Sequence, residues 1–353
     1  MLARFGERLS KAWYSGAFWP LLLAPLSLIY LIALRVIAVF TRAPSITSVP
    51  VIVVGNITAG GTGKSPLVSY LVRHFESKGL RVGIVSRGYG INIPQDEVRL
   101  VSLDSESNQV GDEPLMLKRM LGCDIALCPQ RALAVSALES IGVDIVISDD
   151  GLQHRAMYRD IELCVVDGTR GLGNQWLLPA GPLREPKSRL ASVDAVIFNG
   201  ASSSHCAPLN TLLERASTAK SYMALVPVSF INVDTEAQLS IEQFKSIMSE
   251  RQLSAIAAIG NPQRFFETLK QLNLNVRSAN AFPDHYAFSE SDFSEMHDII
   301  VMTEKDAAKC SALGLKDAWY LRVQPELQDN LGDRLYNQLI EKNRLKPSSE
   351  PEH

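Results

Sequence analysis

A glycine-rich turn between an apolar segment and a helical segment constrains the fold of this chain more than any other feature. Residues 51–54 are Val-Ile-Val-Val, a loop rich in glycine follows, and Lys64 and Ser65 begin a stretch with helical spacing. This order of strand, glycine-rich loop, lysine, hydroxyl and helix is typical of a phosphate-binding loop, because its backbone amides and the helix N-terminus surround one small volume. The pattern predicts an α/β protein that binds a phosphate chain.

The residues of this loop have distinct expected roles. The Lys64 ammonium would reach the terminal phosphates, and the Ser65 hydroxyl would ligate Mg2+. The common spacing GxxxxGK(S/T) places a glycine where this chain has Thr58, so the first turn of the loop must be made differently. The phosphate-binding residues are expected to be Thr58, Ala59, Gly60, Gly61, Thr62, Gly63, Lys64 and Ser65.

A second apolar segment ends in two adjacent acids. Residues 145–148 are Ile-Val-Ile-Ser, and Asp149 and Asp150 follow directly. The carboxyl ends of parallel strands gather the ligands of open α/β sheets, so both carboxylates are candidate Mg2+ ligands. The alternative is that one of them caps a turn.

The rest of the chain continues the α/β pattern. Nearly continuous apolar runs are typical of parallel strands that are covered on both faces. We therefore predict an α/β fold of the P-loop NTPase type, a mostly parallel sheet with helices on both faces, and a smaller C-terminal α/β unit. The length of 353 residues fits more than one domain. The expected divisions are an N-terminal hydrophobic segment (1–43), a P-loop domain (44–228), a smaller α/β domain (229–340) and a flexible tail (341–353).

The N-terminal region contains a long apolar stretch. Residues 17–34 carry no charge, and Trp19 and Tyr30 suit a membrane interface. Pro20 and Pro25 are expected to interrupt a helix there, because proline lacks an amide donor. We predict a membrane-associated helix; the alternative is a hydrophobic helix that docks on the globular body.

Charge and cysteine content exclude other classes of function. The formal net charge is −3, so we expect no nucleic-acid partner. The chain has 5 cysteines, an odd number without a CxxC pair, which indicates neither a disulfide framework nor a zinc site.

Six segments in order resemble one known family. They are 55–66 (GNITAGGTGKSP), 86–90 (SRGYG), 110–114 (VGDEP), 149–154 (DDGLQH), 178–186 (LPAGPLREP) and 303–306 (TEKD). Together they resemble the tetraacyldisaccharide 4'-kinase family of lipid A biosynthesis, over roughly residues 1–325. Thr58 is then similar to that family's own variant of the loop.

The resemblance implies a reaction and a location. It implies Mg2+-dependent transfer of the γ-phosphate of ATP to the 4'-hydroxyl of a tetraacylated glucosamine disaccharide 1-phosphate. It also implies an enzyme of the inner membrane with its catalytic body on the cytoplasmic side. We expect a peripheral or monotopic attachment; an interfacial or re-entrant anchor, or a span with the N-terminus outside, is compatible with this location, whereas a single crossing with the N-terminus inside is not.

The resemblance also implies site residues. It places a catalytic aspartate at Asp112, although Asp112 in its sequence context equally suits a helix N-cap. The matching histidine is His285, which alone would be an ordinary loop residue. Candidate substrate-binding residues are Arg131, Gln153, Arg184 and Glu185.

Two other classes of function remain open at this point. A membrane-anchored P-loop switch or partitioning ATPase commonly has a lysine before the paired glycines, where this chain has Ala59. The third possibility is a soluble nucleotide-binding enzyme whose N-terminal helix only packs on the body.

Overall fold

The computed structural model describes most of the chain. The described residues are 2–41, 44–88, 90–200, 207–284, 286–294, 296, 298–311 and 313–346. The chain divides into two compact units, of which unit 1 comprises Met1–Ala224 and Pro325–His353 and unit 2 comprises Leu225–Gln324. It passes between the units within strand β8 and again within strand β13.

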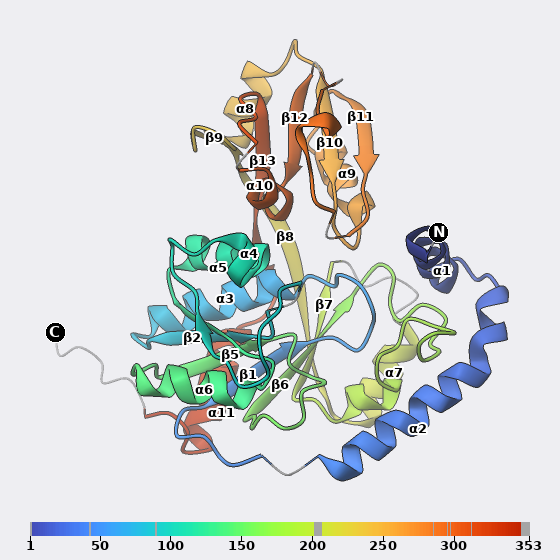
Figure 1. Ribbon diagram of the computed structural model, residues 1–353, viewed down its shortest axis with the longest axis vertical. Helices are drawn as coiled ribbons and strands as arrows, with labels where there is room; N and C mark the ends of the chain where they lie inside the picture. Colours follow the sequence, from blue (N-terminus) through green and yellow to red (C-terminus); the bar gives the residue numbers. More distant parts are fainter. Residues whose placement is uncertain are drawn as a thin grey trace. The chain divides into compact units, whose positions relative to one another are not determined.

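Unit 1 contains the phosphate loop and the N-terminal segment (Figure 1). Its elements are α1 (Leu2–Tyr14), η1 (Trp19–Leu23), α2 (Ala24–Phe40), β1 (Val51–Gly55), α3 (Lys64–Ser77), β2 (Val82–Ser86), β3 (Arg99–Leu100), α4 (Ser107–Val110), α5 (Asp112–Leu121), β4 (Asp124–Leu127), α6 (Arg131–Ser140), β5 (Ile145–Asp149), β6 (Ile161–Asp167), η2 (Lys187–Ala191), β7 (Ala195–Asn199), α7 (Ala207–Arg215), the first part of β8 (Ala219–Asn232) and α11 (Leu331–Glu341).

The strands of unit 1 form a mostly parallel sheet. Their order is β8-β7-β6-β1-β5-β2-β4-β3. Strands β1, β5 and β7 are buried at every position, and the short edge strand β3 pairs antiparallel with β4. The continuous apolar runs therefore correctly predicted a parallel sheet covered on both faces.

The helices of unit 1 cover both faces of this sheet. Parallel crossovers are right-handed, so the helix of a connection lies on the face that the direction of the crossover dictates. From β1 the chain crosses through α3 to β2 and continues to β4, in one direction along the sheet. It then crosses through α6 from β4 back to β5, in the opposite direction, so α3 and α6 lie on opposite faces. The fold class predicted from the sequence is confirmed.

Unit 2 is a smaller α/β structure. Its elements are the rest of β8, β9 (Gln238–Ser240), α8 (Ile241–Ile247), β10 (Leu253–Ala257), α9 (Pro262–Gln271), β11 (Val276–Ala281), η4 (Glu290–Asp292), β12 (Ile299–Thr303), α10 (Glu304–Cys310) and β13 (Ala318–Leu327). Strands β11, β10, β12 and β13 lie in this order and are parallel. The stacked rings of Phe230 and Phe244, with centroids 3.8 Å apart, lie in its core.

The end of the chain differs from the expected domain boundaries. We expected the smaller domain to extend to residue 340, but α11 contacts α3 in unit 1. Leu335 and Leu339 are buried there, and the apolar face of α11 explains its return to the larger unit. In the expected tail, Lys342 and Arg344 bind the loop before β6, whereas residues 347–353 lie outside the described residues.

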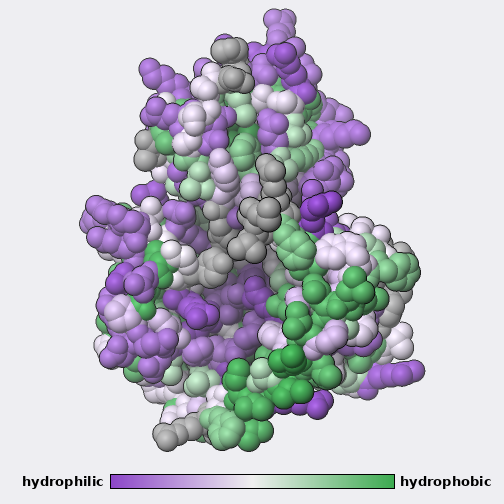
Figure 2. Space-filling view, turned by 45° about the vertical axis from the view of Figure 1, so that its right-hand side comes forward, coloured by the Kyte–Doolittle hydropathy of each residue, from purple (hydrophilic) through white to green (hydrophobic). Residues whose placement is uncertain are grey.

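The N-terminal segment of unit 1 has one strongly apolar, exposed face. Residues Trp19–Phe40 are long and apolar enough to cross a membrane, as judged from length and composition alone. Pro20 and Pro25 lie in the first turns of η1 and α2, where a missing amide donor costs nothing, so α2 continues uninterrupted for 17 residues. Figure 2 shows the continuous apolar surface along this segment, to which Leu22, Leu26, Ile29, Ile32, Val36 and Phe40 contribute.

Candidate active site

The phosphate loop is shaped by its glycines and by a neighbouring strand. Gly63 has φ of +85° at the N-cap of α3, and the Asn199 amide at the end of β7 donates a hydrogen bond of 2.8 Å to the Thr62 carbonyl. A Cβ atom at position 63 would lie 1.9 Å from Asn199 Nδ2. Only glycine allows both this backbone conformation and this close approach.

The structure explains why Thr58 replaces the usual glycine. Thr58 forms an isolated antiparallel β-bridge with Leu183, and the Ala59 amide donates to the Pro182 carbonyl at 2.7 Å. The Asn56 side chain closes the turn by donating to the Thr58 carbonyl at 2.9 Å. A residue in an extended bridge needs no positive φ, so a side chain is accommodated there.

Lys64 and Ser65 both have protein partners at the start of α3. Lys64 Nζ lies 3.5 Å from Asp150 Oδ1 and 3.5 Å from Asn56 Oδ1. The Ser65 hydroxyl donates to Glu113 Oε1 at 2.6 Å. The structure therefore brings the lysine and hydroxyl of the loop together with the carboxylates that follow β5 and begin α5.

The two adjacent aspartates have opposite pKa shifts. Burial, together with the negative charge of Glu113, raises the pKa of Asp149 to about 7, although Lys64 opposes this shift. Burial also disfavours the Asp150 carboxylate, but Lys64 and Arg184 more than offset it and lower the pKa of Asp150. Asp150 has φ of +50°, a backbone conformation that is uncommon outside glycine. The pair therefore resembles a functional site more closely than a turn cap.

The oxygen donors at this position fit Mg2+. Asp149 Oδ1 is buried and has no hydrogen-bond partner among the described residues. No group of three or more His, Cys, Asp or Glu residues in the described part of the chain forms a metal centre by itself. Mg2+ is usually held by one or two carboxylates together with phosphate oxygens, so a site of Ser65, Asp149 and Asp150 needs a bound nucleotide to be complete.

Asp112 begins helix α5 but does not cap it. The N-cap is Gly111, with φ of +84°, and no side chain makes a capping bond. The Asp112 carboxylate is half-buried, and its neighbour Glu113 reaches Ser65. The N-cap interpretation is therefore wrong, whereas the catalytic role of Asp112 remains a prediction. His285 lies outside the described residues.

Arg131 lies inside the unit, behind the paired carboxylates. Its Nη1 donates to Ser148 Oγ at 3.2 Å, and only 4% of the residue is exposed. Burial lowers the pKa of Arg131, while the charges of Asp149 and Asp150 oppose this shift. Its hydrogen bond is made to the residue that precedes the two carboxylates, and contact with substrate remains a prediction.

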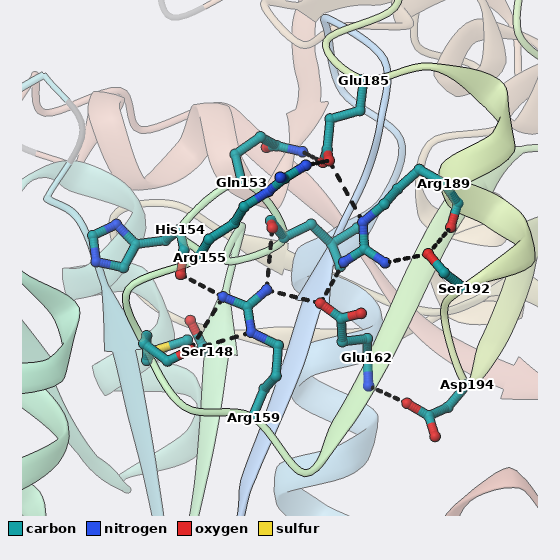
Figure 3. Close-up of polar contacts among 12 residues, drawn as sticks. Ser148, Gln153, His154, Arg155, Arg159, Glu162, Glu185, Arg189, Ser192 and Asp194 are labelled. Atoms are coloured by element: carbon teal, nitrogen blue, oxygen red, sulfur yellow. Dashed lines mark hydrogen bonds and ion pairs between the residues drawn. The ribbon is translucent and has the colours of Figure 1, made fainter. Parts of the chain in front are cut away.

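The other three candidate substrate residues lie around the loop that precedes η2. Arg184 Nη1 donates to Asp150 Oδ2 at 3.1 Å. Gln153 Nε2 donates to the Asn56 carbonyl at 2.9 Å and to Glu185 Oε1 at 2.8 Å. Glu185 is also paired with Arg155 and Arg189, which approach it from different sides in Figure 3. Gln153 and Glu185 thus connect the phosphate loop to an internal charged network.

Sequence analysis missed four residues that shape this site. Asn56 and Asn199 stand at the ends of apolar strands, a position that could have marked them. Glu113 lies within a recognised motif but received no role. Arg170 donates to the Gly61 carbonyl at 3.0 Å from a loop 109 positions away, and no local pattern indicates such a contact.

The fold and this site define a P-loop phosphotransferase that uses ATP. The phosphate loop, the lysine, the hydroxyl and the paired carboxylates all lie at the carboxyl edge of one parallel sheet. The family model described as tetraacyldisaccharide-1-P 4'-kinase matches residues 19–340, and the chain belongs to this family.

Named relatives agree over nearly the whole chain. A tetraacyldisaccharide 4'-kinase of Dechloromonas aromatica is 44% identical over 347 residues, which is 96% of this chain and 98% of the relative. The corresponding kinase of Hahella chejuensis is 41% identical over 342 residues, with 94% and 96% covered. A crystal structure of the "apo" form of LpxK from Aquifex aeolicus in complex with ATP has a TM-score of 0.73 at 26% identity, covering 91% of this chain and 99% of that one.

The family membership establishes the activity. The chain is an ATP-dependent kinase of lipid A biosynthesis that phosphorylates the 4'-position of tetraacyldisaccharide 1-phosphate. The prediction made from the six sequence segments is confirmed, and the partitioning ATPase is not supported.

Proposed function

We propose that phosphoryl transfer takes place at the carboxyl edge of the unit 1 sheet, between β1 and β5. The observation that carries this proposal is the approach of Lys64 and Arg184 to Asp150, beside the contact between Ser65 and Glu113. Phosphoryl transfer requires positioning and charge neutralisation more than covalent chemistry, and this edge supplies both.

Residues 58–65 bind the phosphates of ATP. The loop amides and the N-terminus of α3 present donors to the β- and γ-phosphates. Lys64, whose ammonium lies 3.5 Å from Asp150, would exchange this weak pair for the terminal phosphates. Its charge then stabilises the negative charge that the transferring group carries.

Ser65, Asp149 and Asp150 would hold Mg2+ with the bound nucleotide. When bound, Mg2+ supplies neutralisation of the phosphate charge. The orphaned Oδ1 atom of Asp149 and the Ser65 hydroxyl support this assignment, because both are oxygen donors at the phosphate loop.

Asp112 would accept the proton of the 4'-hydroxyl. Its place at the start of α5, next to Glu113 and so beside the phosphate loop, supports this role. We assign to His285 the orientation of this carboxylate.

The acceptor would contact the rim of the site. Arg184 is the most suitable of the four candidates, because its side chain is 30% exposed and its guanidinium suits phosphate oxygens. Arg131, Gln153 and Glu185 are proposed substrate residues whose contacts favour a supporting role: Arg131 binds Ser148 next to the carboxylates, and Gln153 joins Glu185 to the Asn56 carbonyl before the phosphate loop.

The N-terminal segment would attach the enzyme to the cytoplasmic face of the inner membrane. The exposed apolar side chains of α2 suit the acyl region of a bilayer, whereas Ser27 and Tyr30 on its other side bind the body of unit 1. Both features together favour a monotopic helix that lies along the membrane surface. Extraction of membranes with high salt without detergent should leave the protein in the membrane fraction; full release would contradict this placement.

The activity is tested with the purified full-length protein in detergent. We expect γ-labelled ATP, Mg2+ and tetraacyldisaccharide 1-phosphate to yield a labelled lipid. An acceptor without the 4'-hydroxyl is the matched control and should yield none. Label in the control lipid, or release of inorganic phosphate alone, would contradict the proposed transfer.

A further inference from the structure

The N-terminal helices bind a loop that also forms the wall of the phosphate site. We call residues 177–185 the strap. The Ser27 hydroxyl of α2 donates to the Leu177 carbonyl at 2.8 Å and accepts from the Ala180 amide at 3.1 Å. The Trp13 indole of α1 donates to the Pro179 carbonyl at 3.1 Å. The segment proposed to contact lipid is thus hydrogen-bonded to the strap.

The far end of the strap is bonded to the phosphate loop. Leu183 forms the β-bridge with Thr58, and the Pro182 carbonyl accepts from the Ala59 amide at 2.7 Å. The Arg184 amide donates to the Ile57 carbonyl at 2.7 Å. The strap therefore forms a second, extended segment beside the loop that is proposed to receive the phosphates.

Arg184 is held at three points by three different elements. Its amide binds Ile57 just before the phosphate loop, its guanidinium binds Asp150, and its carbonyl accepts a hydrogen bond of 3.0 Å from the Tyr30 hydroxyl of α2. The internal hydrogen bonds of the strap, such as Leu178 N to Leu183 O at 2.9 Å, end before Arg184. Tyr30 therefore supplies a constraint at Arg184 that the strap itself does not provide.

We propose that Tyr30 is a positioning residue of the ATP site: by holding the Arg184 carbonyl, it keeps the Arg184 guanidinium on Asp150 and the end of the strap against the phosphate loop. Tyr30 acts through Arg184 and does not touch ATP. The apolar helix is then a structural part of the active site as well as an attachment to lipid. This inference rests on the proposed binding of the ATP phosphates by residues 58–65 and on the proposed place of Asp150 in the Mg2+ site.

The inner and outer faces of α2 have different chemistry, which supports this assignment. Ser27 is 4% exposed and Tyr30 is half-buried, and both direct hydroxyls to backbone groups of the strap. Ile29, one position before Tyr30, is 63% exposed. A helix that served only as a lipid anchor would need no hydroxyl groups on its inner face, since an apolar residue packs there without a hydrogen-bond requirement.

The test is Tyr30→Phe, which removes one hydroxyl and keeps the ring. We expect ATP to bind about 3- to 10-fold more weakly to the full-length variant in detergent, because this is the effect of losing one hydrogen bond. Kinase turnover should fall at limiting ATP, while sedimentation with anionic phospholipid vesicles and the thermal midpoint should match the wild type. Ser27→Ala should weaken ATP binding in the same direction.

Tyr158→Phe is the matched control. Tyr158 is a half-buried tyrosine of the same unit whose hydroxyl lies 3.4 Å from Asp160, the residue that binds the first amide of β1 at the opposite end of that strand. It should leave ATP affinity unchanged. Unchanged ATP affinity in Tyr30→Phe, or a loss of vesicle binding alone, would overturn the inference. Absence of ATP binding in the wild type would instead contradict the proposed function.

Discussion

Buried polar groups at the two ends of the unit 1 sheet differ in how completely they are hydrogen-bonded. At the amino end of β1, Asp160 Oδ2 accepts from the Val51 amide at 2.8 Å and Oδ1 accepts from Arg344 Nε at 2.7 Å. At the carboxyl end, Asp149 Oδ1 and the Thr62 hydroxyl are buried without a hydrogen-bond partner among the described residues. Asp160 at one end of β1 is thus fully paired, whereas the other end of the sheet holds buried polar atoms without a hydrogen-bond partner among the described residues.

The difference separates structural from functional polar groups. A buried carboxylate with all its partners stabilises the fold, because its desolvation is offset by charge-assisted hydrogen bonds. A buried carboxylate without them is destabilising on its own and gains its partners from a ligand. Burial and the negative charge of Glu113 raise the pKa of Asp149 to about 7, which is consistent with a buried carboxylate that lacks hydrogen-bond partners. Substitutions at the two ends should therefore have different effects.

The largest effect is expected for Asp112→Asn at the carboxyl end. Turnover should fall by about 10²- to 10⁴-fold because the proposed base is lost, while ATP affinity changes little. Initial rates and ATP titrations measure the two quantities. Glu106→Gln, at the N-cap of the preceding helix α4, is a matched control and should keep normal turnover. A large loss of ATP affinity with normal turnover would contradict the role of Asp112.

Lys64→Ala should reduce phosphoryl transfer by about 10²- to 10³-fold, through the loss of charge stabilisation at the transferred phosphate. The thermal midpoint should change little, because the Lys64 pair with Asp150 is long and partly exposed. Steady-state kinetics and thermal unfolding test both statements. Near-normal activity of the variant would contradict the assignment of residues 58–65 as the phosphate-binding loop.

Arg344→Ala should act at the amino end and affect stability alone. It leaves Asp160 buried without its charged partner, which should cost about 2–4 kcal/mol in the free energy of unfolding. Lys220→Ala removes an exposed ion pair with Glu214 and should cost less than about 1 kcal/mol. Urea unfolding measures both. Equal effects would show that the amino end is not the more strongly bonded region.

The smallest expected effect is the contribution of His154 to the pH dependence of stability. Burial and the positive charges of Arg131, Arg159 and Arg87 lower the pKa of His154 to about 4, from 6.5 in the unfolded chain. The unfolded state therefore binds more protons between these values, and this contribution to stability is lost as the pH falls from 6.5 towards 4. The thermal midpoint should drop more between pH 7 and pH 5 in the wild type than in His154→Gln. An equal drop in both proteins would contradict the lowered pKa.

Much of the fold and part of the site could be predicted from local patterns. The phosphate loop is a contiguous segment, so residues 58–65 were identifiable without any tertiary information. The acids after β5 were found because carboxyl ends of parallel strands share one edge. Strand β11 gives no such signal, because its residues alternate between half-buried and exposed at the edge of unit 2, which leaves no continuous apolar run.

Contacts between distant segments could not be predicted. Ser65 and Glu113 are 48 positions apart, and Thr62 and Asn199 are 137 positions apart. Such pairs depend on the order of the strands, and no residue of β1 shows that its neighbours are β5 and β6. The place of α11 in unit 1 was missed for the same reason, since an amphipathic helix can bury its apolar face on any complementary surface.

The sequence alone determined the chemistry of the protein: a phosphate loop, a pair of carboxylates and an apolar N-terminal segment. Each of these features is formed by consecutive residues, so it can be recognised without tertiary information. The tertiary structure decided how these parts act on one another. Only the folded chain shows that Ser27 and Tyr30 turn inward and bind the strap while Ile29 stays exposed. The physical reason is that hydrogen bonds between segments 150 or more positions apart exist only after the sheet has brought those segments together.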